Sequence, residues 1–235
     1  MAGVRDTATT DTAQLDQLVA LAIERTYEAF SSRALGPSMT LRRPEVTPVE
    51  VSALGGAVRL VPASAIDRWL PHAISTWGSG DDLRALLPRV LELFASGALA
   101  TPPEVLFTKI RQAGADTWSN EEQAAIEDLV TAVWLATLAS DPPRAGHPAW
   151  RLLVAMAELG GDLSPFLDDW TLLLGTRAAE GHAARRHLRA LTRRVEHMTG
   201  AGLGLGALFW SPSPRETERL EEWLAQRLTI DQAGP

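Results

Sequence analysis

Four polar side chains near the middle of the chain are of the types that catalysis and ligand binding use. His72 follows a proline, Asp82 stands at the start of a hydrophobic segment, and Arg89 and Glu92 lie three residues apart within it. A histidine and two carboxylates can transfer protons, and an arginine can stabilise developing negative charge. One hypothesis is therefore an enzyme of unknown reaction with a polar groove around these four residues.

The same side chains also have a structural interpretation, which the sequence favours. A carboxylate such as that of Asp82 is stabilised in the first turn of a helix, and Arg89 and Glu92 can form an ion pair at i,i+3 spacing. Pro88, within the same hydrophobic segment, removes one helical hydrogen bond and predicts a kink. The segment is then a kinked core helix with a local salt bridge.

The composition, or the spacing of the residues, argues against other candidate catalytic and metal sites. The chain has no cysteine, which excludes thiolate nucleophiles and cysteine-based zinc sites. His182, His187 and His197 share one predicted helix, but their spacings differ from the three or four residues that a helical metal site needs, so we expect surface or boundary histidines. The pairs Asp81–Asp82 and Asp168–Asp169 lack the further acidic residue one turn on that magnesium-diphosphate motifs use. We therefore expect no metal and no cofactor.

The longest predicted helix, over about 176–199, carries an arginine-rich side. Arg186, Arg189, Arg193 and partly Arg185 share it. Such a side could contact phosphate groups or an acidic partner, or it could be a solvated surface. We favour the solvated surface, because no aromatic residues are interleaved and the net charge of -7 opposes nucleic-acid binding.

Four glycines alternate with alanine and leucine over 200–206. A helix precedes this segment, whereas the dinucleotide-binding glycine motif follows a strand, so a linker or hinge is the better interpretation. Trp210, just beyond it, is the one tryptophan of the eight that we expect to be exposed. It therefore joins the candidate binding residues.

The hydrophobic periodicity predicts an all-α fold: an irregular array of about nine helices packed as antiparallel hairpins. Thr101–Glu104 and Ser119–Glu122 have the pattern of capping boxes at helix starts. Residues 34–62 are rich in proline and glycine, and we expect an irregular or weakly β segment there. Residues 1–10 form a polar tail that we expect to be disordered, and 11–232 are expected to form a single helical domain.

The composition indicates where in the cell the protein is expected to be. Hydrophobic residues make up 46% of the chain, but charges break every apolar run well before the ~20 residues of a membrane span. We therefore expect a cytoplasmic protein with no membrane partner. Lys109 is the only lysine among 22 basic residues. This bias is typical of proteins from GC-rich bacterial genomes.

The segment 69–93 resembles an element of a group of uncharacterised bacterial proteins. Its first half matches an aromatic-x-x-x-Ala-x-x-Thr-x-Gly pattern at Trp69, Ala73, Thr76 and Gly78. Residues 86–93, Leu-Leu-Pro-Arg-Val-Leu-Glu-Leu, match a helix of that group, with Leu86 in place of its usual aromatic residue. Residues 118–134 resemble a further element. The resemblance implies a shared helical fold and no particular activity; many members also carry cysteines in the segment that corresponds to 34–62.

Two function classes lead after these exclusions, and a nucleic-acid binder ranks third. A helical array without a catalytic constellation favours a protein-interaction or regulatory module, of the adaptor or immunity kind, whose partner is another protein. The alternative is the enzyme with His72, Asp82, Arg89 and Glu92 in a groove. The oligomeric state stays open at this stage.

Overall fold

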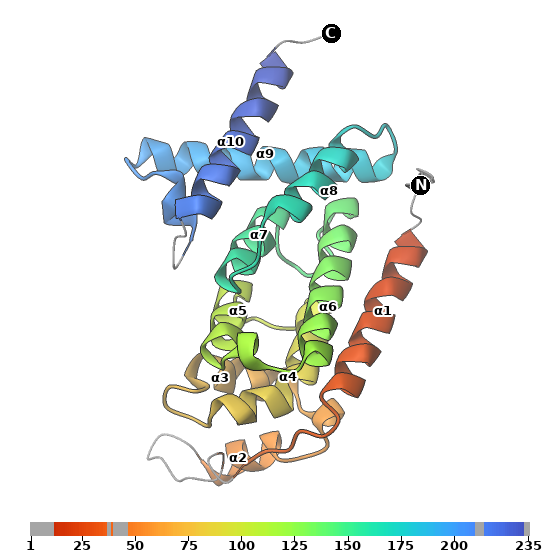
Figure 1. Ribbon diagram of the computed structural model, residues 1–235, viewed down its shortest axis with the longest axis vertical. Helices are drawn as coiled ribbons and strands as arrows, with labels where there is room; N and C mark the ends of the chain where they lie inside the picture. Colours follow the sequence, from red (N-terminus) through yellow and green to blue (C-terminus); the bar gives the residue numbers. More distant parts are fainter. Residues whose placement is uncertain (1–11, 37–38, 40–46, 210–213, 233–235) are drawn as a thin grey trace.

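The regular elements of the protein are helical throughout the residues that the computed structural model describes, which are 12–36, 39, 47–209 and 214–232 (Figure 1). Ten α-helices form there: α1 (Thr12–Ala29), α2 (Pro48–Leu54), α3 (Ala63–Trp69), α4 (Gly80–Ala95), α5 (Pro103–Gln112), α6 (Asn120–Ala139), α7 (Ala149–Glu158), α8 (Ser164–Leu174), α9 (Ala179–Gly200) and α10 (Pro214–Gln232). The all-α prediction is confirmed. The predicted tail over 1–10 lies outside the described residues.

The segment 34–62 differs from the prediction where it is described. Thr47 caps the short helix α2, and its side chain closes a capping box with Glu50. Val58–Leu60, in the segment expected to be irregular or weakly β, forms the 3-10 helix η2. No strand forms in the described part of 34–62. The described part of this proline- and glycine-rich segment thus contains short helices and no strand.

Local capping explains where two of the longer helices begin. The Ser119–Glu122 box at the start of α6 is present as predicted, with the side-chain oxygen of each residue accepting a hydrogen bond from the backbone N–H of the other. A second box, which the sequence analysis missed, joins Ser79 and Asp82 at the start of α4. The predicted box at Thr101–Glu104 was wrong, because Thr101 hydrogen-bonds to Asp67 and no side chain caps α5.

Two prolines inside hydrophobic segments have different effects. Pro71 stands where a helix is interrupted: α3 ends at Trp69, and the 3-10 helix η3 (Leu70–His72) follows. Pro88, by contrast, lies inside α4, which continues to Ala95. A helix therefore ends just before Pro71, whereas α4 continues through Pro88.

The most extensive helix packing joins elements that are far apart in the sequence. The helix α1 packs along α6, and α5 packs against α7. The long helix α9 contacts α6, α7 and α8, and in Figure 1 it lies across the upper end of these helices, where α10 crosses it. No helix in the described ranges is both long and apolar enough to cross a membrane.

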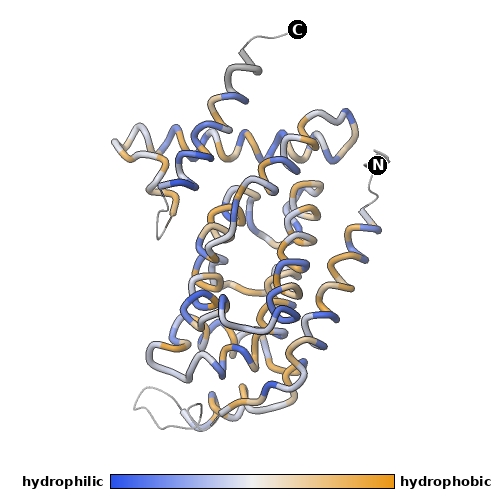
Figure 2. Tube along the Cα trace, viewed as in Figure 1, coloured by the Kyte–Doolittle hydropathy of each residue, from blue (hydrophilic) through white to orange (hydrophobic). Residues whose placement is uncertain are grey.

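One continuous cluster of buried hydrophobic side chains extends from Leu15 to Leu224. Hydrophobic and hydrophilic positions alternate along the helices in the amphipathic pattern that such a core needs (Figure 2). Trp134 of α6 and Trp170 of α8 are completely buried, with ring centroids 5.7 Å apart in an edge-to-face arrangement. The ring of Trp170 also packs against that of Trp223 of α10, with the ring centroids 5.1 Å apart. The aromatic contacts thus connect α6, α8 and α10.

Candidate functional site

Asp82, one of the four candidate polar residues, is buried at the N-terminus of α4. Its Oδ1 accepts a hydrogen bond from the Gly36 N–H at 2.7 Å, and its Oδ2 accepts from both the N–H and the hydroxyl of Ser79 at 2.8 Å. A carboxylate held in this way stabilises the start of α4 and fixes the segment that follows α1. Its described contacts are those of a helix junction.

Arg89 and Glu92 form the i,i+3 ion pair that their spacing allows, with Nη1 of Arg89 2.8 Å from Oε2 of Glu92. Arg89 Nε donates to the Val61 carbonyl at 2.9 Å, and the same Glu92 oxygen accepts from the Tyr27 hydroxyl at 2.6 Å. Burial, and then the nearby Glu92 carboxylate, raises the pKa of Tyr27. The pair therefore attaches α1 and η2 to α4.

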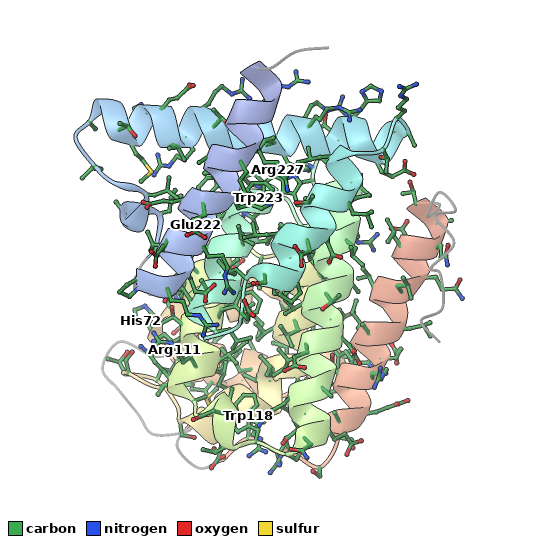
Figure 3. The ribbon with its side chains drawn as sticks, turned by 45° about the horizontal axis from the view of Figure 1, so that its top comes forward. His72, Arg111, Trp118, Glu222, Trp223 and Arg227 are labelled. Atoms are coloured by element: carbon green, nitrogen blue, oxygen red, sulfur yellow. The ribbon has the colours of Figure 1, made fainter. Side chains whose placement is uncertain are left out.

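The structure does not bring the four candidates together. Asp82 and Arg89 are seven residues apart on α4, which separates their backbones by about 10 Å along the helix axis. His72 is exposed at the end of η3 (Figure 3), and its ring makes no hydrogen bond to any residue that the structure describes. The fifth candidate, Trp210, lies outside the described residues.

A groove that the sequence analysis missed lies between α6, α7 and α8, with a volume of about 470 Å³. Its floor is hydrophobic and is formed by Ile126, Val130, Met156, Leu159 and Phe166. Ile126 and Val130 are one helical turn apart on α6, so both face the same side. The two belong to the hydrophobic stripe that the sequence indicated as core.

Four carboxylates surround this hydrophobic floor, and no lysine or arginine lines it in the described part of the chain. They are Asp116 in the 3-10 helix η4 (Ala115–Thr117), Glu127 on α6, Asp162 before α8, and Asp169 on α8. Asp116 and Glu127 are exposed and form no ion pair within the described ranges. No three His, Asp or Glu side chains among the described residues are grouped so that they could hold a metal ion.

Asp162 is ionised at neutral pH. A hydrogen bond from the Ser164 backbone N–H lowers the pKa of the Asp162 carboxyl below its usual value, and the Ser164 hydroxyl and Arg219 lower it further. The Ser164 N–H lies 2.9 Å from Oδ1 of Asp162. Asp162 therefore contributes a negative charge to the rim, although Arg219 of α10 offsets part of it.

The walls of the groove are fixed by contacts on their far sides. Phe166 packs edge-on against the buried Trp134 with ring centroids 5.9 Å apart. The Leu163 N–H donates to the buried Glu216 carboxylate of α10 at 3.1 Å, which holds the start of α8. Gly160 has a φ of +89° in the turn after α7, a conformation that favours glycine. Contacts within the protein thus hold the walls of the groove.

The sequence does contain the groove residues, but its patterns assign them to other roles. Asp168–Asp169 lacks the further acidic residue of a metal motif, and the carboxylates of the rim come from four separate segments. Neither hydrophobic periodicity nor local spacing indicates that these segments meet, because their meeting depends on how α6, α7 and α8 pack.

No protein-family model matches the sequence, and no curated protein or solved structure is significantly similar to it. The geometry of the groove therefore carries the functional argument.

Proposed function

We propose that the protein is an interaction module whose groove between α6, α7 and α8 binds a basic amphipathic helix of a partner protein. The observation that carries this proposal is the combination of a hydrophobic floor with a rim of four carboxylates and no described basic lining residue. An amphipathic helix presents hydrophobic side chains at i, i+3, i+4 and i+7, which suits such a floor. Lysine and arginine residues beside that stripe would then lie near the rim.

The distribution of the rim charges supports a peptide rather than a small cation. The carboxylates come from four elements around the groove, and no three of the described acidic or histidine side chains converge on one point. A single small cation gains most from convergent oxygen ligands, whereas a segment with several basic residues can approach spread-out charges. The net charge of -7 also favours the approach of a cationic partner.

The enzyme alternative is supported by the sequence argument alone, because the described contacts do not bring its four residues together. Asp82, Arg89 and Glu92 are engaged at helix junctions by their described hydrogen bonds, and His72 is exposed. A catalytic groove needs nucleophile, acid and base within hydrogen-bonding reach of one reacting atom. The interaction module is therefore the proposal that the described contacts support better.

Fluorescence anisotropy with a labelled amphipathic peptide of about 18 residues, or five helical turns, tests the proposal. The peptide carries leucine along one side and lysine on both flanks, and a second peptide replaces each lysine by glutamate. We expect the lysine peptide to bind with an affinity that falls as salt rises, and the glutamate peptide not to bind. Equal binding of both peptides would count against the acidic rim as the recognition element.

A matched pair of variants separates the rim from the general charge of the protein. Asp116→Asn/Glu127→Gln removes two rim charges, and Glu28→Gln/Glu221→Gln removes two exposed charges on α1 and α10. At about 0.5–1 kcal/mol for each rim charge, the first variant weakens binding by about 5- to 30-fold. The second changes it less than about twofold, because its charges are remote and screened.

A further inference from the structure

A second cavity, with a volume of about 620 Å³, lies between α8, α9 and α10, apart from the groove floor. Four arginines line it: Arg185, Arg189 and Arg193 of α9 and Arg227 of α10. The three on α9 follow one another at intervals of four residues and so project from the same side of the helix. Arg227 reaches the cavity from the helix that crosses α9 (Figure 3).

Two of these guanidinium groups are held in place by hydrogen bonds. Arg185 Nη1 donates to the carbonyls of Leu174 and Thr176, at 2.9 and 3.0 Å, where α8 ends. Arg227 Nη2 donates to the Thr171 hydroxyl at 2.8 Å, and the Trp223 indole N–H donates to the same oxygen at 2.9 Å. Two positive groups are thus oriented at the cavity wall before a ligand arrives.

The charges of these four arginines are not balanced by ion pairs within the described residues. No carboxylate forms an ion pair with any of them in the described ranges, and Glu196 is the one acidic side chain in the described lining. The buried Nε of Arg227 has no acceptor among the described residues. Like charges around one cavity repel one another, and a bound anion would remove that repulsion.

Arg186 of α9 is paired, which distinguishes the cavity from a uniformly basic helix: it forms an ion pair with Asp141. Tryptophan contacts do not separate the two groups, because Arg194 outside the cavity lies 5.8 Å from the ring centroid of Trp150 and Arg227 inside it lies 5.7 Å from that of Trp223. Arg186, expected on one solvated side with Arg189 and Arg193, does not line the cavity. Four arginines without an ion pair among the described residues therefore meet where α8, α9 and α10 come together.

We propose that this cavity binds a small organic polyanion through phosphate or carboxylate groups. Guanidinium groups bind both kinds of oxyanion with paired N–H donors, and the volume lies within the roughly 300–1,000 Å³ typical of small-molecule sites. Leucines of α8 and α9 offer a hydrophobic wall for a short carbon skeleton. Nucleic acid fits less well, because no described aromatic ring lines the cavity for base stacking.

Isothermal titration calorimetry at low ionic strength tests the proposal with two probes, pyrophosphate and citrate. The test variant is Arg189→Gln/Arg193→Gln, and the control is Arg186→Gln/Arg194→Gln, which removes the same charge from the same helix outside the cavity. Arg189, Arg193 and Arg194 are exposed, as is Arg186, so both variants are expected to keep the fold, which circular dichroism checks.

We expect one equivalent of at least one probe to bind the unaltered protein. The cavity variant weakens binding by at least about 10-fold, and the control by less than about twofold. Binding of pyrophosphate alone assigns a phosphorylated ligand, binding of citrate alone assigns a polycarboxylate, and binding of both leaves the shared oxyanion chemistry. The proposal is overturned if neither probe binds, or if the two variants weaken binding equally, since general electrostatics then accounts for the effect.

Discussion

Replacement of Glu122 by glutamine probes the polar junction between the end of α1, the start of α4 and the start of α6. The Glu122 side chain is 1% exposed and accepts hydrogen bonds from Arg84 Nε at 2.8 Å and Arg33 Nε at 2.9 Å. A second Arg84 nitrogen, Nη2, contacts its other oxygen. The hydroxyl and the backbone N–H of Ser119 donate to that second oxygen at 2.9 and 3.1 Å. Glutamine has the same shape but leaves both arginines without their counter-charge.

The loss in free energy of unfolding depends on how well water can reach the two arginines. Loss of one partner of a buried ion pair costs about 3–5 kcal/mol. The side chain of Arg84 is only 15% exposed, but that of Arg33 is 36% exposed and can be solvated. We therefore expect the lower end, about 3 kcal/mol, which lowers the melting temperature of a chain of this size by about 6–12 °C.

The same junction makes stability depend on pH. Burial raises the pKa of Glu122, but hydrogen bonds from Arg84, Arg33 and Ser119 outweigh it and hold the value at about 2. The unfolded chain, with a glutamate pKa of about 4.3, takes up the proton first as pH falls. The free energy of unfolding of the unaltered protein therefore decreases from about pH 5 to about pH 2, and the gap to Glu122→Gln narrows.

Urea denaturation followed by tryptophan fluorescence at pH 7, 5 and 3 measures both effects. Glu121→Gln is the matched control, because this neighbouring carboxylate is exposed in the same first turn and is worth about 0.5 kcal/mol. A Glu122→Gln variant no less stable than the control, or a gap that stays constant with pH, would refute the reasoning.

Three further changes test other parts of the structure. Asp82→Ala removes the α4 cap and the acceptor for the Gly36 N–H, and we expect a loss of about 2–3 kcal/mol in urea denaturation; an unchanged midpoint would contradict its junction role. Trp170→Ala empties the contact between α6, α8 and α10 and costs about 3–5 kcal/mol in the same assay; a cost below that of a surface substitution would argue against that contact. Burial lowers the pKa of His187, so the unfolded chain protonates first as pH falls through about 6.5, and the melting temperature drops below that pH; His187→Gln should remove that part of the drop, and an unaltered pH profile in the variant would contradict it.

The parts of the fold that depend on neighbouring residues could be predicted from the sequence. The Ser119–Glu122 box is complete within four residues, and it correctly marks the start of α6. The box at Thr101 failed because Asp67, 34 residues earlier, accepts hydrogen bonds from the backbone and hydroxyl of Thr101. The Thr101 pattern thus failed because a distant carboxylate took the groups on which it depended.

His187 shows the same limit within one helix. Arginines surround it in the sequence, which favours a surface position, but its side chain is buried. Its Nε2 lies 2.9 Å from the Thr137 carbonyl, at the C-terminal end of α6. The packing of α9 on α6, and not the helical pattern of α9, decides which residue of the arginine-rich stretch is covered.

The candidate sites were least accessible from the sequence because several helices build each of them. The groove takes residues from η4, α6, α7 and α8, and the arginine-lined cavity takes them from α8, α9 and α10. The arginine spacing on α9 indicated a common side, but only the position of Arg227 makes that side part of a cavity. The contacts between non-consecutive helices supply this information.

Photo-cross-linking of the basic amphipathic peptide, followed by mass spectrometry, tests the central claim most directly. The peptide carries a benzophenone group among its leucines. The account predicts cross-links within 115–131 and 156–169, and their loss in Thr131→Arg, which places bulk and positive charge at an exposed position of the groove. Cross-links concentrated on α1 or α10, or a pattern that Thr131→Arg leaves unchanged, would contradict it.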